Sequence, residues 1–142
     1  MVCFAESLPF ADGSFDLVVT RIAAHHFVDV SQAVAELVRV SRSRVLVVDI
    51  RQDDAGEEAE RLRDPSHVRN YTEPEWRGFL EAAGAEVEAV RVLDVRIELE
   101  ARLERTGCAG GDAARVRELL AGRTWGGQLA MRRIALRAAV QR

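Results

Sequence analysis

The chain has 142 residues, enough for one domain with its own core, and 48% of them are hydrophobic. Its 23 acidic and 20 basic residues are interspersed and leave a net charge of −3, which argues against a nucleic-acid partner. No apolar run approaches the ~20 residues that span a bilayer and only two cysteines are present, so we expect a cytoplasmic protein without membrane contact.

The first predicted strand covers Phe15–Val19. This apolar run follows the turn residues Asp12–Ser14 and ends at Thr20. Short continuous apolar runs are typical of strands that are buried on both faces of a parallel sheet. A second run of this kind, Val45–Ile50, predicts another strand of the same sheet.

Between these strands the sequence predicts an amphipathic helix of about three turns. Asp29 and Gln32 have the spacing of a capping box, and apolar residues recur at every third or fourth position over Val30–Val38. A strand, a helix and a strand at this spacing form a βαβ unit with a right-handed crossover. Arg42–Arg44 is then the turn that leads into the second strand.

Charged residues dominate Arg51–Arg63, whose weak helical periodicity fits a surface helix or a mobile loop. The helix that follows has clearer signals. Thr72 and Glu75 form a capping box, Pro74 lies in the first turn, and Gly84 is placed to end the helix. Its predicted buried face consists of Trp76, Phe79, Leu80 and Ala83.

A further strand is predicted where apolar residues alternate over Val87–Leu99. Leu99 and Leu103 could instead open a helix, and this boundary stays open. Gly110–Gly111 breaks the chain, and Ala113–Leu120 then predicts a helix.

The last predicted element is a strand over Ile134–Val140, where apolar residues alternate cleanly. The segment Trp125–Gly127 precedes it and predicts a turn, because its glycines permit positive φ angles. We expect the Trp125 indole to pack on the end of the sheet.

The segment from Ala5 to Val19, closed by His25-His26-Phe27, resembles the middle of a class I S-adenosylmethionine-dependent methyltransferase. Residues 63–71 resemble a bacterial subgroup of methyltransferase type 11, related to the ubiquinone/menaquinone-biosynthesis methyltransferases. The resemblance implies an α/β fold, namely the C-terminal part of a Rossmann-like methyltransferase fold with a mostly parallel sheet. It also implies that the final strand inserts antiparallel between its neighbours, and that residues 1–142 form a single, partial domain.

The resemblance implies S-adenosylmethionine as the cofactor and suggests the residues that contact it. Ala5 and Glu6 match the adenine pocket, where a backbone N–H and a short acceptor meet the edge of the base. Phe4 could stack on the base. Thr20 and Arg21 match residues of the cofactor wall that follow the strand.

His25 and His26 are the candidate catalytic residues. They lie just beyond the carboxyl end of the first predicted strand, where open α/β sheets place their ligand clefts. A histidine there could act as a general base on the methyl acceptor, because its reference pKa of about 6.5 is close to working pH. Alternatively, one ring packs against Phe27 and the other bonds a loop carbonyl.

His67 and Arg69 are candidate substrate-binding residues, because a loop with these side chains near the cleft could recognise an anionic or hydroxylated small molecule. The same loop could instead be purely structural, with Asp64 paired to Arg69 and Tyr71 packed under the helix that contains Trp76. The histidines and cysteines never reach a metal-ligating spacing, so no metal is expected.

In members of this family a glycine-rich loop that holds the methionine end of the cofactor precedes the matching segment. The chain begins at Met1 with that segment, so we expect it to lack the N-terminal half and to have little or no methyltransferase activity in isolation. The strand at Phe15–Val19 would then expose its free edge. We expect self-association or pairing with a separate N-terminal half, and the alternative function is a non-catalytic interaction module.

Overall fold

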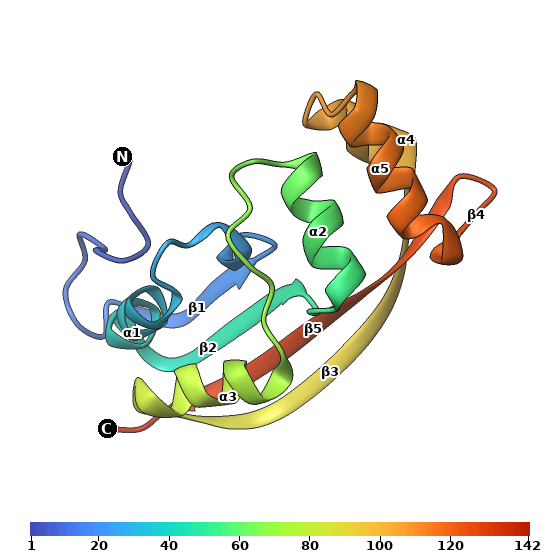
Figure 1. Cartoon of the computed structure of the whole chain (residues 1–142). Coiled ribbons are helices and arrows are strands. Elements are labelled where there is room, and N and C mark those ends of the chain that lie inside the picture. Colours follow the sequence, from blue (N-terminus) through green and yellow to red (C-terminus); the bar gives the residue numbers. More distant parts are fainter.

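The computed structural model describes the backbone of residues 1–142 and the side chains of residues 1–53 and 56–142 (Figure 1). A five-stranded sheet is formed by β1 (Phe15–Arg21), β2 (Ser41–Ile50), β3 (Ala85–Glu98), β4 (Thr124–Trp125) and β5 (Gln128–Val140). The α-helices are α1 (Val30–Val40), α2 (Asp54–Arg63), α3 (Glu73–Ala82), α4 (Leu99–Arg105) and α5 (Gly110–Leu120). Two short 3₁₀ turns are η1 (Ala24–His26) and η2 (Ala121–Arg123). Among the described residues, no helix has the length and apolar character needed to cross a bilayer.

The strand order is β1-β2-β5-β3, with the short β4 paired to β5. β1 and β2 are parallel, whereas β5 is antiparallel to β2, β3 and β4. The prediction that the last strand inserts antiparallel between its neighbours is therefore confirmed. The sheet is mixed rather than mostly parallel, because the central position of β5 makes every pairing except β1–β2 antiparallel.

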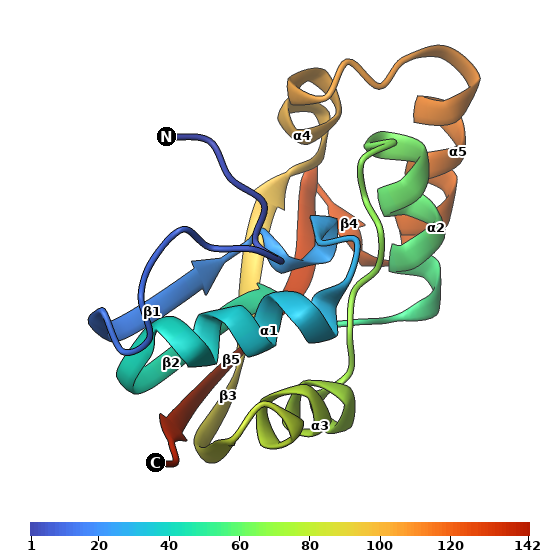
Figure 2. The ribbon, with the colours of Figure 1, turned by 90° about the vertical axis from the view of Figure 1, so that its left-hand side faces the viewer.

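β1 lies at an edge of the sheet, and only one of its faces is covered. Val18 packs into the core, but Phe15, Leu17 and Val19 are 40%, 54% and 50% exposed. The prediction of a strand buried on both faces is wrong because α1 covers a single face of β1 (Figure 2). The strand also extends one residue past Thr20, to Arg21, which pairs with Val48 of β2.

The two predicted capping boxes differ in the structure. At α3 the box is complete, since Thr72 accepts a bond from the Glu75 backbone and the Glu75 side chain accepts one from the Thr72 backbone. At α1 Asp29 accepts a bond from the backbone N–H of Gln32 at 3.0 Å, but the Gln32 side chain donates to the carbonyl of Glu6 instead of returning to the cap.

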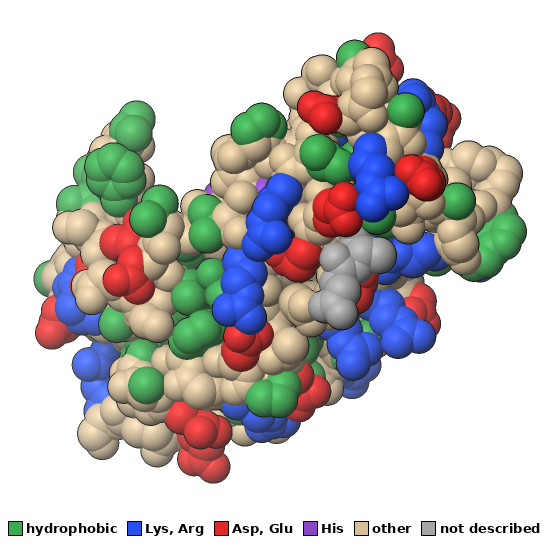
Figure 3. Space-filling model, viewed as in Figure 1, with side chains coloured by type: hydrophobic (Ala, Val, Ile, Leu, Met, Phe, Trp, Pro, Cys, Tyr) green, Lys and Arg blue, Asp and Glu red, His purple; other side chains and the backbone are tan. Residues whose placement is uncertain are grey.

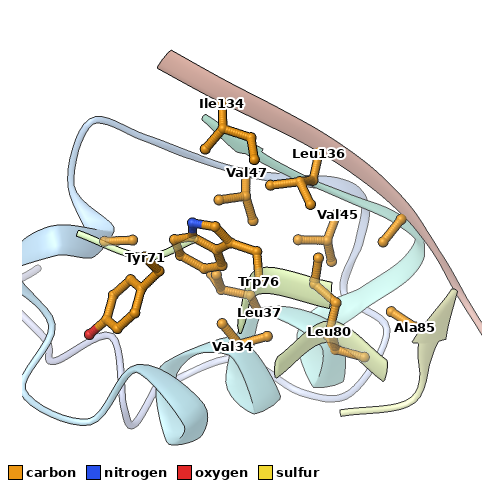
Figure 4. Close-up of a cluster of buried hydrophobic side chains, with 13 residues drawn as sticks. Val34, Leu37, Val45, Val47, Tyr71, Trp76, Leu80, Ala85, Ile134 and Leu136 are labelled. Atoms are coloured by element: carbon orange, nitrogen blue, oxygen red, sulfur yellow. The ribbon is translucent and has the colours of Figure 1, made fainter. Parts of the chain in front are cut away.

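The main core lies between the sheet and the helices α1 and α3 (Figure 2). Trp76 and Leu80 of α3 are fully buried and point toward the sheet residues Val45, Val47 and Leu136 (Figure 4). Tyr71 packs edge-on against Trp76, with ring centroids 5.3 Å apart. This packing confirms the prediction that Tyr71 lies under the helix that contains Trp76.

A second core lies at the far end of the long β3–β5 ribbon, where α2, α4 and α5 gather (Figure 1). The β5 residues that pack in this second core, Leu129 and Met131, have odd numbers. Those that pack in the main core have even numbers: Ile134, Leu136 and Ala138. Because successive side chains of a strand point to opposite faces, the two cores lie on opposite faces of the ribbon.

Within the charged segment Arg51–Arg63, for which the sequence predicts a surface helix or a mobile loop, Asp54–Arg63 forms α2, and this helix is more buried than a surface helix. Ala59 packs in the second core. The buried carboxylate of Glu60 pairs with Arg63 at 2.7 Å and with Arg102 of α4 at 2.6 Å. This ion-pair triad holds α2 against α4.

Several predicted boundaries shift. Arg42–Arg44 belongs to β2 and is not a turn. The open boundary near residue 99 resolves as a strand that ends at Glu98 and a helix that begins at Leu99. Gly110–Gly111 opens α5 instead of standing before it. The Trp125 indole does not pack on the sheet, because this residue is 57% exposed.

Candidate functional site

The candidate site begins where β1 ends. Ile22 has a φ angle of +51°, in the left-handed region, and its N–H donates to the carbonyl of Val48 at 2.8 Å. A β-branched residue in this region costs about 1–3 kcal/mol and persists only where surrounding contacts fix it. The strained turn directs the chain into η1, which places His25 and His26 beside the carboxyl ends of β1 and β2.

Asp49 of β2 holds His25 through two bonds. Its Oδ1 lies 2.6 Å from the ring Nδ1, and its Oδ2 accepts the backbone N–H at 3.0 Å. The side chains of His25 and Asp49 are only 4% and 2% exposed. Since an ionised carboxylate can only accept, we assign the ring proton to Nδ1. His25 is therefore buried and fixed by a carboxylate.

The backbone of His25 anchors the loop that follows α2. Its carbonyl accepts bonds from the backbone N–H groups of Val68 and Arg69, at 2.8 and 3.2 Å. This arrangement links Asp49, η1 and the loop formed by residues 64–71. Asp49 is a functional candidate that the sequence analysis missed. Its signal in the sequence was an acidic residue near the end of an otherwise apolar strand.

His26 lies at the surface of the same cluster, with its side chain 35% exposed. Its Nδ1 is 3.0 Å from the Ser66 carbonyl and 3.2 Å from the Ser66 hydroxyl. Ser66 Oγ donates to Asp64 Oδ1 at 2.6 Å, and this bond lowers the pKa of Asp64. Because the Ser66 carbonyl can only accept, we assign a proton to Nδ1, and Nε2 is then the acceptor nitrogen of the neutral ring.

The two neighbouring histidines thus have different surroundings. Their ring centroids are 4.1 Å apart. His25 is enclosed and bonded to a carboxylate, whereas His26 presents Nε2 near the surface, 3.9 Å from Asp64 Oδ2. His26 is the one of the two that a ligand could reach.

His67 is buried below this pair, and its ring centroid lies 5.5 Å from that of His25. His67 Nε2 is 3.3 Å from Glu57 Oε2, and Glu57 Oε1 accepts the backbone N–H of Asn70 at 2.7 Å. Burial lowers the pKa of His67, although the carboxylate of Glu57 partly opposes this effect. These contacts support a structural role for His67 over contact with a substrate.

Arg69 is half exposed and forms an ion pair with Glu75 of α3, with its guanidinium 5.2 Å from the Tyr71 ring. The predicted pairing of Asp64 with Arg69 is wrong. Asp64 instead bonds Ser66 and faces His26, because the turn at Ser66 brings it toward η1.

The five predicted cofactor residues do not form an enclosed site. Glu6 Oε1 already accepts the backbone N–H groups of Val28 and Asp29, at 3.0 and 3.1 Å. Phe4 is 80% exposed, Ala5 is partly buried, Thr20 is buried at the end of β1, and Arg21 is exposed. None of the five is among the described residues that line the cavity of about 650 Å³ or the smaller cavity that shares several of its residues. These residues by themselves do not fit a nucleoside. The described residues also contain no group of three or more ligands that could hold a metal ion.

Comparisons with known proteins find similarity to methyltransferases. Residues 1–49 match the methyltransferase domain family. The chain is 39% identical to the uncharacterized methyltransferase YcgJ of Bacillus subtilis over 111 residues, 72% of this chain and 44% of that protein. It is 41% identical to the uncharacterized protein YafE of Escherichia coli over 93 residues, 60% of this chain and 45% of that protein.

The crystal structure of YcgJ superimposes with a TM-score of 0.87 at 28% identity, covering 97% of this chain and 69% of that one. The α/β methyltransferase fold therefore extends over nearly all of the residues described here. In the sequence comparisons, however, the chain spans less than half the length of the two curated relatives that it matches.

Proposed function

Because the chain belongs to the methyltransferase domain family, we propose that it takes part in S-adenosylmethionine-dependent methyl transfer to a small-molecule acceptor in the cytoplasm. The single observation that supports a role for this chain in the chemistry is His26. Its Nε2 lies near the surface, at the end of β1, while Ser66 holds the other ring nitrogen. This is the end of the sheet where α/β folds bind their ligands.

In this proposal His26 is the general base. It removes a proton from the acceptor when the acceptor nucleophile is a hydroxyl or a protonated amine, and Asp64 then stabilises the imidazolium. His25 and Asp49 are positioning residues, because they fix η1 and, through the His25 carbonyl, the loop that holds Ser66. A base that is already held in one orientation loses less conformational entropy when the transition state forms.

We further propose that the isolated chain has little or no methyltransferase activity. Phe4, Ala5, Glu6, Thr20 and Arg21 line neither cavity, and the Glu6 carboxylate is engaged by backbone groups. Without an enclosed cofactor site, S-adenosylmethionine would be bound weakly. When bound in a complete domain, the cofactor supplies the electrophilic methyl group.

A fusion protein tests both statements. The part of YcgJ that lies N-terminal to its match with this chain would be joined to Met1, and binding of S-adenosylhomocysteine would be measured by calorimetry for the fusion and for the chain alone. We expect the fusion to bind at least about a hundredfold more tightly, a difference of about 2.7 kcal/mol. A folded fusion that does not bind would contradict the proposed function. Methyl transfer by the chain alone would contradict only the proposal that the isolated chain is inactive.

A second candidate function is non-catalytic association through β1. In the part of the chain that the structure describes, no strand pairs with its outer edge, and Phe15, Leu17 and Val19 expose apolar surface along one face. An exposed apolar edge strand is a site for pairing with another strand. We commit to a second copy of this chain as the partner, because two identical edges can pair antiparallel about a twofold axis.

Light scattering at several protein concentrations tests this association. We expect a dimer for the native chain and a monomer for Leu17→Lys, which places a charge on the exposed face. The matched control is Val28→Lys, an exposed residue outside β1. A native chain that stays monomeric at all concentrations would exclude the second copy as a partner.

A further inference from the structure

A cavity of about 650 Å³ lies beyond the end of β2, away from the histidine cluster. It is formed by the segment Arg51–Asp53, by Arg123 of η2, and by the facing stretches Asp94–Arg96 of β3 and Ala130–Arg132 of β5. This volume lies within the range of ~300–1,000 Å³ that is typical of small-molecule sites. None of these residues belongs to the candidate methyl-transfer site.

The lining of this cavity is basic. Among its described residues are four arginines and two aspartates. Figure 3 shows several arginine side chains on the right-hand side of the molecule, with acidic side chains among them. Two of the arginines are neutralised, because Arg123 pairs with Asp53 at 2.7 Å and Arg132 with Asp94 at 3.3 Å.

The other two arginines, Arg51 and Arg96, have side chains without an ion pair or hydrogen bond among the described residues. They approach the cavity from different elements, Arg51 from the end of β2 and Arg96 from β3. A guanidinium presents several N–H donors in a planar fork that matches a phosphate or a carboxylate. Two uncompensated guanidinium groups on one cavity favour an anionic ligand.

The cavity also has an apolar part. Val95, Ala130 and Met131 also contribute to its lining, and all three are only partly buried. A free inorganic anion would leave this surface in contact with water. A ligand with an anionic head and an apolar body would cover it and gain about 25 cal/mol for each Å² of apolar area buried.

We propose that this cavity binds a small organic anion, a phosphate monoester or a carboxylate attached to an apolar group. Arg51 and Arg96 bind the anionic head, and Val95, Ala130 and Met131 contact the body. The paired Arg123 and Arg132 keep the walls in place. This proposal goes beyond methyl transfer and does not depend on it, because it uses no residue of the His26 site.

The two methionines of the chain make a direct test possible. Met131 lines the cavity, whereas Met1 lies at the exposed amino terminus. A sample with ¹³C-labelled methionine methyl groups would be titrated with phenyl phosphate, with benzoate and with the neutral benzyl alcohol. We expect phenyl phosphate or benzoate to shift the Met131 signal in a saturable way, and benzyl alcohol at the same concentration to leave it in place. The Met1 signal is the internal reference.

Substitution of both arginines completes the test. In the double variant Arg51→Gln and Arg96→Gln, we expect the affinity for the anion to fall about tenfold or more. Arg91→Gln is the matched control, since Arg91 is exposed on β3 but does not line the cavity. The proposal is wrong if neither anion produces a saturable Met131 shift, if benzyl alcohol shifts it equally, or if the double variant binds as tightly as the native chain.

Discussion

Asp49 and His25 form a buried pair in which one carboxylate bonds both the ring and the backbone of the same histidine, at 2.6 and 3.0 Å. The pair joins the ends of β1 and β2 and, through the His25 carbonyl, fixes the loop that holds Ser66. A single interaction therefore controls the position of most of the candidate site.

Replacement of Asp49 by Asn tests this pair. An amide is a weaker acceptor and presents an N–H₂ group to a site where three donors already point, the ring and backbone of His25 and the backbone N–H of Ile50. We therefore expect the free energy of unfolding to fall by about 1–3 kcal/mol. Urea denaturation measures the change. Asp16→Asn is the control, because the Asp16 side chain is 82% exposed and its loss should cost less than about 0.5 kcal/mol. Equal effects of the two changes would argue against a special role for Asp49.

His67 should make stability depend on pH. Burial lowers its pKa in the folded chain below the reference value of about 6.5. As the pH falls through that value, the unfolded chain takes up a proton that the folded chain does not, so the folded state loses stability. Between pH 7.5 and 5.5 we expect the native chain to lose more stability than His67→Gln, which keeps a polar group near Glu57. Parallel loss in both proteins would contradict this assignment.

The capping box of α3 gives a local prediction. Thr72 accepts the backbone N–H of Glu75, so Thr72→Ala should lower the free energy of unfolding by about 1 kcal/mol. Thr72→Ser retains the hydroxyl and should cost much less. Thermal denaturation of the two variants compares them directly, and the prediction is wrong if serine destabilises the chain as strongly as alanine.

Glu60 is expected to be among the most sensitive polar residues. Burial opposes its ionisation, but the neighbouring Arg102 and Arg63 hold the pKa of Glu60 below its usual value. Glu60→Gln leaves two buried guanidinium groups without their carboxylate, a loss of about 3–5 kcal/mol. Glu58→Gln, at a half-exposed position on the same helix, should have a small effect. Denaturant unfolding distinguishes the two, and similar midpoints would refute the prediction.

The sequence predicted the order of the elements well, because helical periodicity, capping residues and alternating strands are local signals. It also placed His25 and His26 correctly at the end of β1, since that position follows from the strand itself. The partner of His25 was missed because Asp49 lies 24 residues away, and only the parallel pairing of β1 with β2 brings the two together.

Burial could not be predicted for the neighbouring histidines. The His25 ring is enclosed because it bonds the buried Asp49 and lies beside His67, whereas the His26 ring meets Ser66 nearer the surface. The same limit applies to β1, whose apolar sequence does not reveal that only one face is covered. The roles of Phe4, Ala5, Glu6, Thr20 and Arg21 in cofactor binding remain predictions.

Because β5 contributes side chains to both cores, the alignment of β5 with β3 is constrained on both faces of the sheet. Leu129 and Met131 are needed on one face, and Ile134, Leu136 and Ala138 on the other. A shift of one residue along β3 would turn both sets outward at once and leave two hydrophobic clusters without their side chains. A misaligned pairing of β5 with β3 is therefore unfavourable at both ends of the ribbon, and this secures the alignment of two strands that α4, α5, η2 and β4 separate in the chain.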